Sequence, residues 1–548
     1  MDIKRLILFV IFSFSILMLW DAWQKDLHPV LTPAPQVASD KAAPVQTGKS
    51  TADFAGKVAH DFGGMPLAGK RLKVQTDLIS AELDTLGGDL RRVELLKYQD
   101  SVDKTKRLVL LDDKPKDVYV AQSGLIGSGL PTHNTLFSST DTQYKLADGE
   151  DSLVVKLNWA DPNGIRVGKI YTFHRGSYVV DVTYEIDNGS VNRLVPHSYF
   201  QLVRNGRPPV GDPKFISTYT GPAIYTEKEK FHKVSFSDIE KNKAAYPMQS
   251  DDGWVAMIQL YFLSAWIPPN NQPREYFAKK LGDDLYDVGA ILPLGAIEAG
   301  ASKTITMHFY AGPQEQVQLS KVAPGLDLTV DYGRLTLIAA PLFWVLAWIH
   351  KAVQNWGVAI ILLTVLIKAA FYPLSAKSYR SMAQMRILGP KLQKLKEQYG
   401  DDRQRLHQAM MELYKTEKVN PLGGCLPVVV QIPVFIALYW ALLNSVEMRQ
   451  APFMLWVTDL SAPDPYYILP IVMGLTMIIQ TKLNPTPPDP IQAKVMMIMP
   501  IAFSVFFFFF PAGLVLYWVV NNTLSITQQY YVTRSIERAK TAKGHAKG

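Results

Sequence analysis

The spacing of hydrophobic positions changes near residue 324 and divides the chain into two parts. Over residues 67–324 apolar side chains recur at every second position, as in Val180, Val182 and Tyr184, and turn sequences rich in Asp, Asn, Pro and Gly separate the runs. Alternation between such turns is typical of antiparallel strands with one buried face. The pattern therefore predicts a large antiparallel β-sandwich domain over residues 67–325.

The second part contains long apolar runs in place of alternating positions. Runs of this kind are typical of membrane-spanning helices. They cover residues 356–375, 422–444, 466–481, 494–510 and 514–533. We therefore predict a five-helix membrane core over residues 356–533.

A segment at residues 335–356 connects the two parts. Leu342, Leu346 and Ile349 recur at helical spacing, with polar residues between them. This pattern predicts an amphipathic helix that lies in the membrane interface. A helix packed on the β domain is the alternative.

The connection between the first two core segments, residues 376–421, has a helical pattern of its own. Two apolar stripes are separated by Gly400 and two aspartates. Glycine commonly ends a helix and aspartate commonly begins one. We predict a helical hairpin that stands on the cytoplasmic surface.

The N-terminus combines Lys4 and Arg5 with an uncharged run over residues 6–20. No small-residue cleavage site follows at once, so we prefer a retained transmembrane anchor over residues 1–23 to a removed signal peptide. Residues 24–66 are rich in Pro, Ala, Gln, Ser and Thr. Such a composition cannot bury a core and predicts a flexible periplasmic linker.

Charge sets the predicted topology. The 376–421 connection has ten Lys and Arg against five acids, and the tail after residue 533 is also basic. Positive residues favour the cytoplasmic side, so we expect both termini in the cytoplasm and the β domain in the periplasm. With the anchor, this makes a six-helix membrane region. Cys425 is the only cysteine, which excludes an internal disulfide.

The predicted core spans contain no Asp or Glu, which argues against a proton- or sodium-coupled transporter. They do contain Lys368, nine residues before Lys377 and roughly 13 Å from the cytoplasmic boundary along a helix. An ammonium facing lipid at that depth is costly, so we expect it to face water inside the protein. A snorkelling lysine at a helix end is the alternative. Thr364 lies one turn earlier on the same face.

Other spans carry uncharged polar side chains at similar depths, and with Lys368 they suggest a hydrated groove. Methionines nearby offer adaptable apolar contacts. From the residues alone, we expect binding of something apolar and variable from the cytoplasmic side. The polar residues include Gln431, Asn444, Tyr517, Asn521, Asn522, Ser525, Gln528 and Gln529.

Several motifs are similar to a known family. The run Val419-Asn-Pro-Leu-Gly-Gly-Cys425, then Gln431-Ile-Pro433 and Gly513-Leu-Val-Leu-Tyr517, resembles the signature of the YidC/Oxa1/Alb3 membrane-insertase family. Gly253-Trp-Val-Ala-Met257 in the β domain extends the resemblance to its Gram-negative form, which has a large periplasmic domain.

The resemblance implies a non-enzymatic insertase and folding chaperone of the bacterial inner membrane, without metal or cofactor. It implies a groove open to cytoplasm and lipid, with the charge at Lys368, where the family generally has Arg, and an aromatic region at Tyr517 and Trp518. The expected partners are nascent membrane-protein clients, the ribosome, the Sec translocon and the lipid bilayer. The predicted groove residues are Lys368, Thr364, Gln431, Tyr517, Trp518 and Asn521.

The basic tail at residues 534–548 is predicted to be flexible and, with the hairpin, to face the ribosome through Arg534, Arg538, Lys540, Lys543 and Lys547. A purely topological role for these charges is the alternative. For the whole chain, two other functions remain open at this point. One is a membrane-anchored periplasmic carbohydrate-binding or epimerase-like protein, and the other is a coupled solute transporter.

Overall fold

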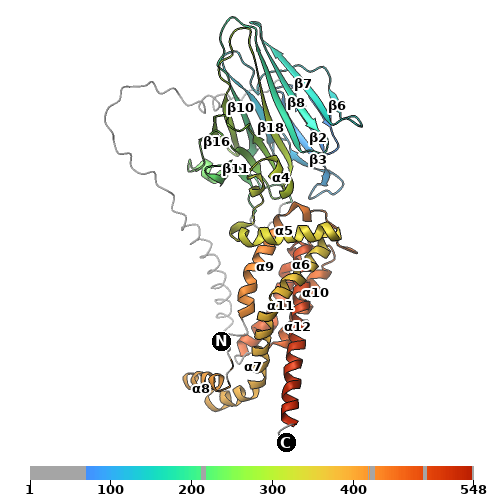
Figure 1. Cartoon of the computed structure of the whole chain (residues 1–548), viewed down its shortest axis with the longest axis vertical. Coiled ribbons are helices and arrows are strands. Elements are labelled where there is room, and N and C mark those ends of the chain that lie inside the picture. The colour runs from blue at the N-terminus through green and yellow to red at the C-terminus, as the bar shows by residue number, and fades with distance from the viewer. Residues whose placement is uncertain are drawn as a thin grey trace, which may run out of the picture.

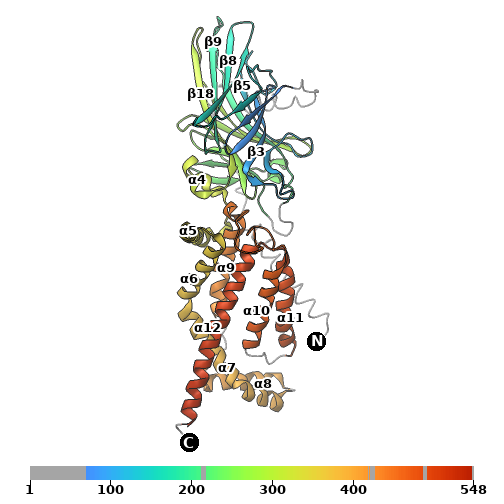
Figure 2. The ribbon, with the colours of Figure 1, turned by 90° about the vertical axis from the view of Figure 1, so that its right-hand side faces the viewer.

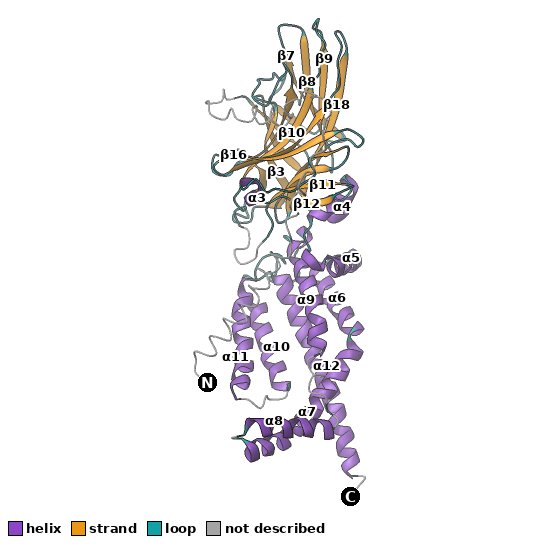
Figure 3. Ribbon diagram, turned by 90° about the vertical axis from the view of Figure 1, so that its left-hand side faces the viewer, coloured by secondary structure: helices purple, strands orange, loops and turns teal. Residues whose placement is uncertain are grey.

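A computed structural model of the chain describes residues 69–211, 218–400, 402–417, 419, 426–484 and 490–545. The predicted anchor (1–23) and linker (24–66) lie outside the described residues. Strands form one end of the molecule and a helical region forms the other, as Figure 1 and Figure 3 show.

The β domain is built from two large sheets. One has ten strands in the order β13-β16-β17-β10-β5-β3-β2-β1-β6, with β4 paired to β3, and the other has eight in the order β12-β11-β14-β15-β18-β9-β8-β7. The strands are β1 (Arg71–Gln75), β2 (Ile79–Asp84), β3 (Asp89–Gln99), β4 (Arg107–Leu111), β5 (Tyr119–Ile126), β6 (Gln143–Lys145), β7 (Ser152–Ala160), β8 (Ile165–His174), β9 (Val179–Asn188), β10 (His197–Asn205), β11 (Gly221–Thr226), β12 (Lys230–Lys233), β13 (Gln249–Ser250), β14 (Trp254–Ile258), β15 (Phe262–Ile267), β16 (Arg274–Gly282), β17 (Leu285–Pro293) and β18 (Ser302–Pro313). The short helices α3 (Phe236–Glu240) and α4 (Gln316–Val322) complete the domain.

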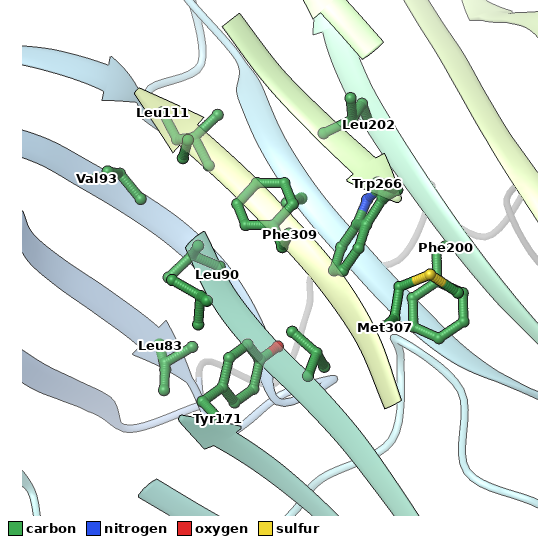
Figure 4. Close-up of a cluster of buried hydrophobic side chains, with 14 of the residues drawn as sticks. Leu83, Leu90, Val93, Leu111, Tyr171, Phe200, Leu202, Trp266, Met307 and Phe309 are labelled. Atoms are coloured by element: carbon green, nitrogen blue, oxygen red, sulfur yellow. The ribbon is translucent and has the colours of Figure 1, made fainter. Parts of the chain in front are cut away.

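The alternating positions explain this architecture. In β9 every second residue from Val180 to Ile186 is buried, and β9 pairs antiparallel with β8 and β18. The core between the sheets joins aromatic side chains of both. The ring of Phe200 on β10 lies 5.1 Å from that of Trp266 on β15, which lies 4.5 Å from that of Phe309 (Figure 4). The large β domain is therefore as predicted.

The helical region follows directly. Its elements are η1 (Leu326–Thr329), η2 (Gly333–Leu335), α5 (Thr336–Val353), α6 (Trp356–Ala370), α7 (Tyr372–Tyr399), α8 (Arg403–Thr416), α9 (Leu426–Asn444), η4 (Val446–Met448), α10 (Ile468–Leu483), α11 (Pro490–Phe506), η5 (Phe507–Phe509) and α12 (Ala512–His545). Helix α5 lies across the ends of the other long helices, below the β domain (Figure 1), and its Trp344 and Trp348 are exposed.

The first core segment ends earlier than predicted. Helix α6 stops at Ala370, and α7 begins at Tyr372 with an axis bent by 67°. Pro373 lies in the first turn of α7, where the missing N–H of proline is tolerated. The predicted span 356–375 is therefore two helices.

Other apolar runs also form helices shorter than the runs themselves. Within the described residues, α5 alone passes a length and composition test for crossing a bilayer, and the bent pair α6–α7 is a second candidate. The apolar helices Val430–Asn444, Ile468–Leu483 and Lys494–Phe509 are shorter. The six-helix count therefore stays a prediction.

The prediction for the hairpin agrees with the structure, and the prediction of a flexible tail does not. Helices α7 and α8 break at Gly400, and the Asp402 carboxylate accepts from the backbone N–H groups of Gln404 and Arg405, as the sequence predicts. The tail, in contrast, is not a flexible strand of chain where it is described. Helix α12 continues to His545, since Arg, Glu, Lys and Ala after Thr533 all favour helix.

Candidate functional site

Lys368 lies inside the helical region and not on its surface. The residue is 8% exposed, and its Nζ donates to the Ser525 hydroxyl of α12 over 2.6 Å. The Ser525 hydroxyl in turn donates to the backbone carbonyl of Asn521 over 2.8 Å. Among the described residues no carboxylate lies within ion-pairing distance of Lys368. A buried cation is therefore stabilised by neutral groups of a neighbouring helix.

Thr364 is buried one turn before Lys368, but its hydroxyl is already engaged. Its Oγ1 donates to the carbonyl of Ile360 over 2.6 Å. Such back-bonding satisfies a buried hydroxyl within its own helix. Thr364 therefore contributes shape, rather than a free hydrogen-bonding group, to this region.

One face of α12 carries an aromatic side chain nearer its N-terminus and polar side chains one and two turns further along. Tyr517, Asn521 and Ser525 are four residues apart and share that face. The Tyr517 ring stacks on Phe435 of α9 at 6.0 Å, and the Trp518 ring meets Phe435 edge-on at 4.4 Å. The Lys368 contact thus leads along α12 to an aromatic cluster shared with α9.

Not all predicted groove residues join this chain of contacts. Gln431 is partly buried on α9, and the hydrogen bonds between described residues do not reach from it to Lys368. Two members were not assigned from sequence. Ser525 is one of the polar residues of the predicted spans, and its spacing of four from Asn521 places both on one face of α12, whereas Phe435 has no distinguishing signal within its apolar run.

The opposite end of these helices is covered by the loop between α9 and α10. The Asn355 side chain accepts from the N–H of Val358, which caps α6, and donates to the carbonyl of Phe453 over 2.8 Å. A Cβ on Gly357 would lie 2.1 Å from the Phe453 ring, so only glycine permits this approach. The N–H of Gly513 bonds the carbonyl of Leu460 over 2.9 Å. The loop is thus fastened to the first turns of both α6 and α12.

The same loop also contacts the β domain. Arg449 Nη2 donates to the carbonyl of Gln99 over 2.7 Å and to the Ser101 hydroxyl over 3.1 Å. Its guanidinium lies 5.4 Å from the centre of the Phe262 ring. Lys104 and Asp459 form a long ion pair of 3.9 Å. These contacts hold the two parts of the molecule together.

The basic residues of α12 are placed only in part. Arg534 and Arg538 are exposed, and Arg534 Nη1 donates to the Tyr530 hydroxyl over 2.9 Å. Lys540 and Lys543 lie within the helix, with side chains outside the described set, and Lys547 lies beyond the described residues.

Comparisons with known proteins cover nearly the whole chain. Residues 71–345 match the YidC periplasmic domain model, and residues 348–540 match the 60Kd inner membrane protein model. A membrane protein insertase YidC from Methylobacillus flagellatus is 60% identical, covering 99% of each chain, and one from Nitrosospira multiformis is 54% identical, again covering 99% of each. A crystal structure of an active YidC insertase, with its first transmembrane domain resolved, matches 85% of this chain and 95% of that one at 18% identity and a TM-score of 0.41. On its sequence, the chain belongs to the YidC family of membrane protein insertases, non-enzymatic inner-membrane proteins with a periplasmic domain.

Proposed function

We propose that this chain inserts nascent inner-membrane proteins through a groove formed by α6, α9 and α12, and that it assists their folding. The observation that carries the proposal is the buried, carboxylate-free ammonium of Lys368, which contacts Ser525 across the α6–α12 boundary. A cation without an acidic partner attracts acidic segments of a client.

The change from polar to aromatic side chains along α12 provides the path that a client segment follows. A polar client segment that enters beside Lys368 and Asn521 leaves water only in part, which lowers the cost of crossing the bilayer. The apolar segment then contacts Tyr517 and Trp518 before it moves into lipid. Burial of apolar area at about 25 cal/mol per Å² drives that last step.

The groove is proposed to open toward the cytoplasm and to close toward the periplasm. The support is the loop that Asn355, Gly357 and Gly513 fasten over the far end of the helices. In this topology the chain crosses the membrane six times with the anchor 1–23, and both termini are cytoplasmic. Helix α5 lies in the interface, where its exposed Trp344 and Trp348 favour the headgroup level.

The proposed partners are clients, the ribosome and, for some clients, the Sec translocon. The exposed Arg534 and Arg538 support a ribosome-facing role for the end of α12, since ribosomal RNA is anionic. The hairpin α7–α8 provides a second cytoplasmic surface of the same kind.

Crosslinking of stalled ribosome–client complexes tests the groove. A photoreactive residue is placed at Gln431, Trp518 or Asn521, and a matched one at Met497 on α11, which is exposed on the outer surface. We expect short client chains to crosslink at the three groove positions and not at Met497. Equal crosslinking at all four positions, or crosslinking at Met497 alone, would contradict a groove on this side of the bundle.

A further inference from the structure

A cavity of about 280 Å³ lies where loops of the β domain meet the periplasmic end of the helices. Its walls come from the β3–β4 hairpin, Gly211 after β10, the turn between β14 and β15, the α9–α10 loop and the segment just before α12. Its lining residues include Lys104, Tyr261, Arg449, Asp459, Ser461 and Phe509. The cavity lies apart from Lys368, which is not among its lining residues.

Two cations line this cavity. Arg449 donates to neutral oxygens of Gln99 and Ser101, and no carboxylate of the described residues lies within ion-pairing distance of it. Its Nε is buried without a partner. Burial lowers the pKa of Arg449, which reflects the cost of holding this charge away from water. An anion beside Arg449 and Lys104 would offset that cost.

A carboxylate faces one of these cations. Asp459 is largely buried, accepts from the Ser461 hydroxyl over 2.7 Å through Oδ1, and lies 3.9 Å from Lys104 through Oδ2. At 3.9 Å this pair is longer than a charge-assisted hydrogen bond. The cavity therefore presents both signs of charge, which suits a zwitterionic group better than a simple anion.

The rim of the cavity is continuous with an exposed apolar surface along α11. Phe509 is 59% exposed on that rim, and apolar side chains along α11, including Met497, Ile501 and Phe506, are exposed below it. Figure 2 shows α11 at one side of the helical region, ending below the β domain. An acyl chain lying along α11 would bring its headgroup to the cavity.

We propose that this cavity binds the phosphoethanolamine headgroup of a phospholipid in the periplasmic leaflet. Its phosphate lies between Arg449 and Lys104, and its ammonium pairs with Asp459. The bound lipid would bridge the β domain and the α11–α12 turn. A client segment is the less favoured occupant, because the rim joins the surface of α11 and not the aromatic face of α12.

The test uses the full-length protein, delipidated in detergent and then given equimolar phosphatidylethanolamine and phosphatidylglycerol, with the retained lipid counted by native mass spectrometry. We expect the wild type to retain phosphatidylethanolamine preferentially. Lys104→Gln should weaken retention roughly threefold, as loss of a partly exposed charge contact does. Asp459→Asn should abolish the preference between the two lipids, since only the ethanolamine carries an ammonium.

Lys106→Gln is the matched control, since Lys106 lies in the same hairpin, pairs with Asp103 and does not line the cavity. Arg449→Lys keeps the charge and should retain the lipid, whereas Arg449→Gln should lower lipid retention roughly tenfold.

Soluble glycerophosphoethanolamine should compete with the lipid, and inorganic phosphate at the same concentration should not. Equal retention by all variants, equal competition by phosphate, or client crosslinks at Phe509 in place of lipid would each overturn the proposal.

Discussion

Lys368 is the side chain whose charge should matter more than its shape. It is buried against Ser525 without an acidic partner in the described part of the chain, so a client acid has no internal competitor. We expect Lys368→Arg to retain insertion and Lys368→Ala to lower it about fivefold for clients with acidic leaders, which is the effect of about 1 kcal/mol. Lys368→Glu should be worst. Protease protection of newly made clients measures each variant.

Ser525→Ala provides the matched control for charge. It removes the oxygen that Lys368 contacts but leaves the ammonium, so insertion should fall less than in Lys368→Ala. Normal insertion of acidic-leader clients by a stably expressed Lys368→Ala protein would show that the lysine has a structural role only.

Asp287 should make the stability of the β domain depend on pH. It is buried on β17, its Oδ1 has no partner among the described residues, and burial raises its pKa to about 7. Between pH 4 and pH 7 the unfolded chain loses this proton while the folded domain keeps it, so stability falls as pH rises and is constant above 7. Each pH unit in this range lowers the free energy of unfolding by about 1.4 kcal/mol. Asp287→Asn should abolish this fall in urea titrations followed by tryptophan fluorescence, and an unchanged pH profile would refute the assignment.

At the scale of elements, Asn355 at the start of α6 makes two hydrogen bonds whose effects can be separated. Its Oδ1 caps the helix and its Nδ2 holds the loop at Phe453. Asn355→Ala loses both, at a cost of about 1 kcal/mol for the cap. Asn355→Asp keeps the cap but cannot donate to the loop. We expect both variants to increase labelling of Phe453→Cys by an impermeant thiol reagent, in a Cys425→Ser background, and only Asn355→Ala to lower the melting temperature further. Equal protection of the thiol in all three proteins would mean that the loop does not depend on this bond.

The end of α12 should contribute ionic attraction to the ribosome. Arg534 and Arg538 are exposed on a helix, which presents its charges at fixed spacing. Truncation after Thr533 should weaken ribosome co-sedimentation at low salt, and moderate salt should reduce the difference, because counterion release governs such contacts. Identical binding by the truncated and complete proteins would leave these residues only their effect on topology.

Local rules predicted some elements and failed for others. The alternation in β9 and the Asp402 cap of α8 follow from nearest neighbours, so both could be predicted. The bend at Phe371 does not show in hydropathy alone, since the predicted span runs on to residue 375, although Pro373 is a residue that commonly begins a new helix. The site shows the same division. Lys368 can be identified from the sequence as a single charge within an apolar run. Its contact with Ser525 depends on how α6 and α12 are rotated relative to each other, which residue spacing along one helix does not determine.

At the scale of the whole molecule, the question is how far insertion of clients depends on the β domain. Lys368 and its partners on α12 lie outside that domain, whereas Arg449 and Lys104 join it to the α9–α10 loop. We therefore expect a chain that lacks the middle of the β domain, but keeps α5 from Leu335 onward, to insert simple clients at near wild-type yield. A deletion that includes Gln99 and Ser101 leaves Arg449 without these two acceptors, so the melting temperature of the helical region should fall. Arg449→Gln within the deleted protein should recover part of that loss, since it removes a charge that no longer has its partners. Loss of insertion in a stably expressed deletion, with the melting temperature unchanged, would show that the β domain acts on clients directly.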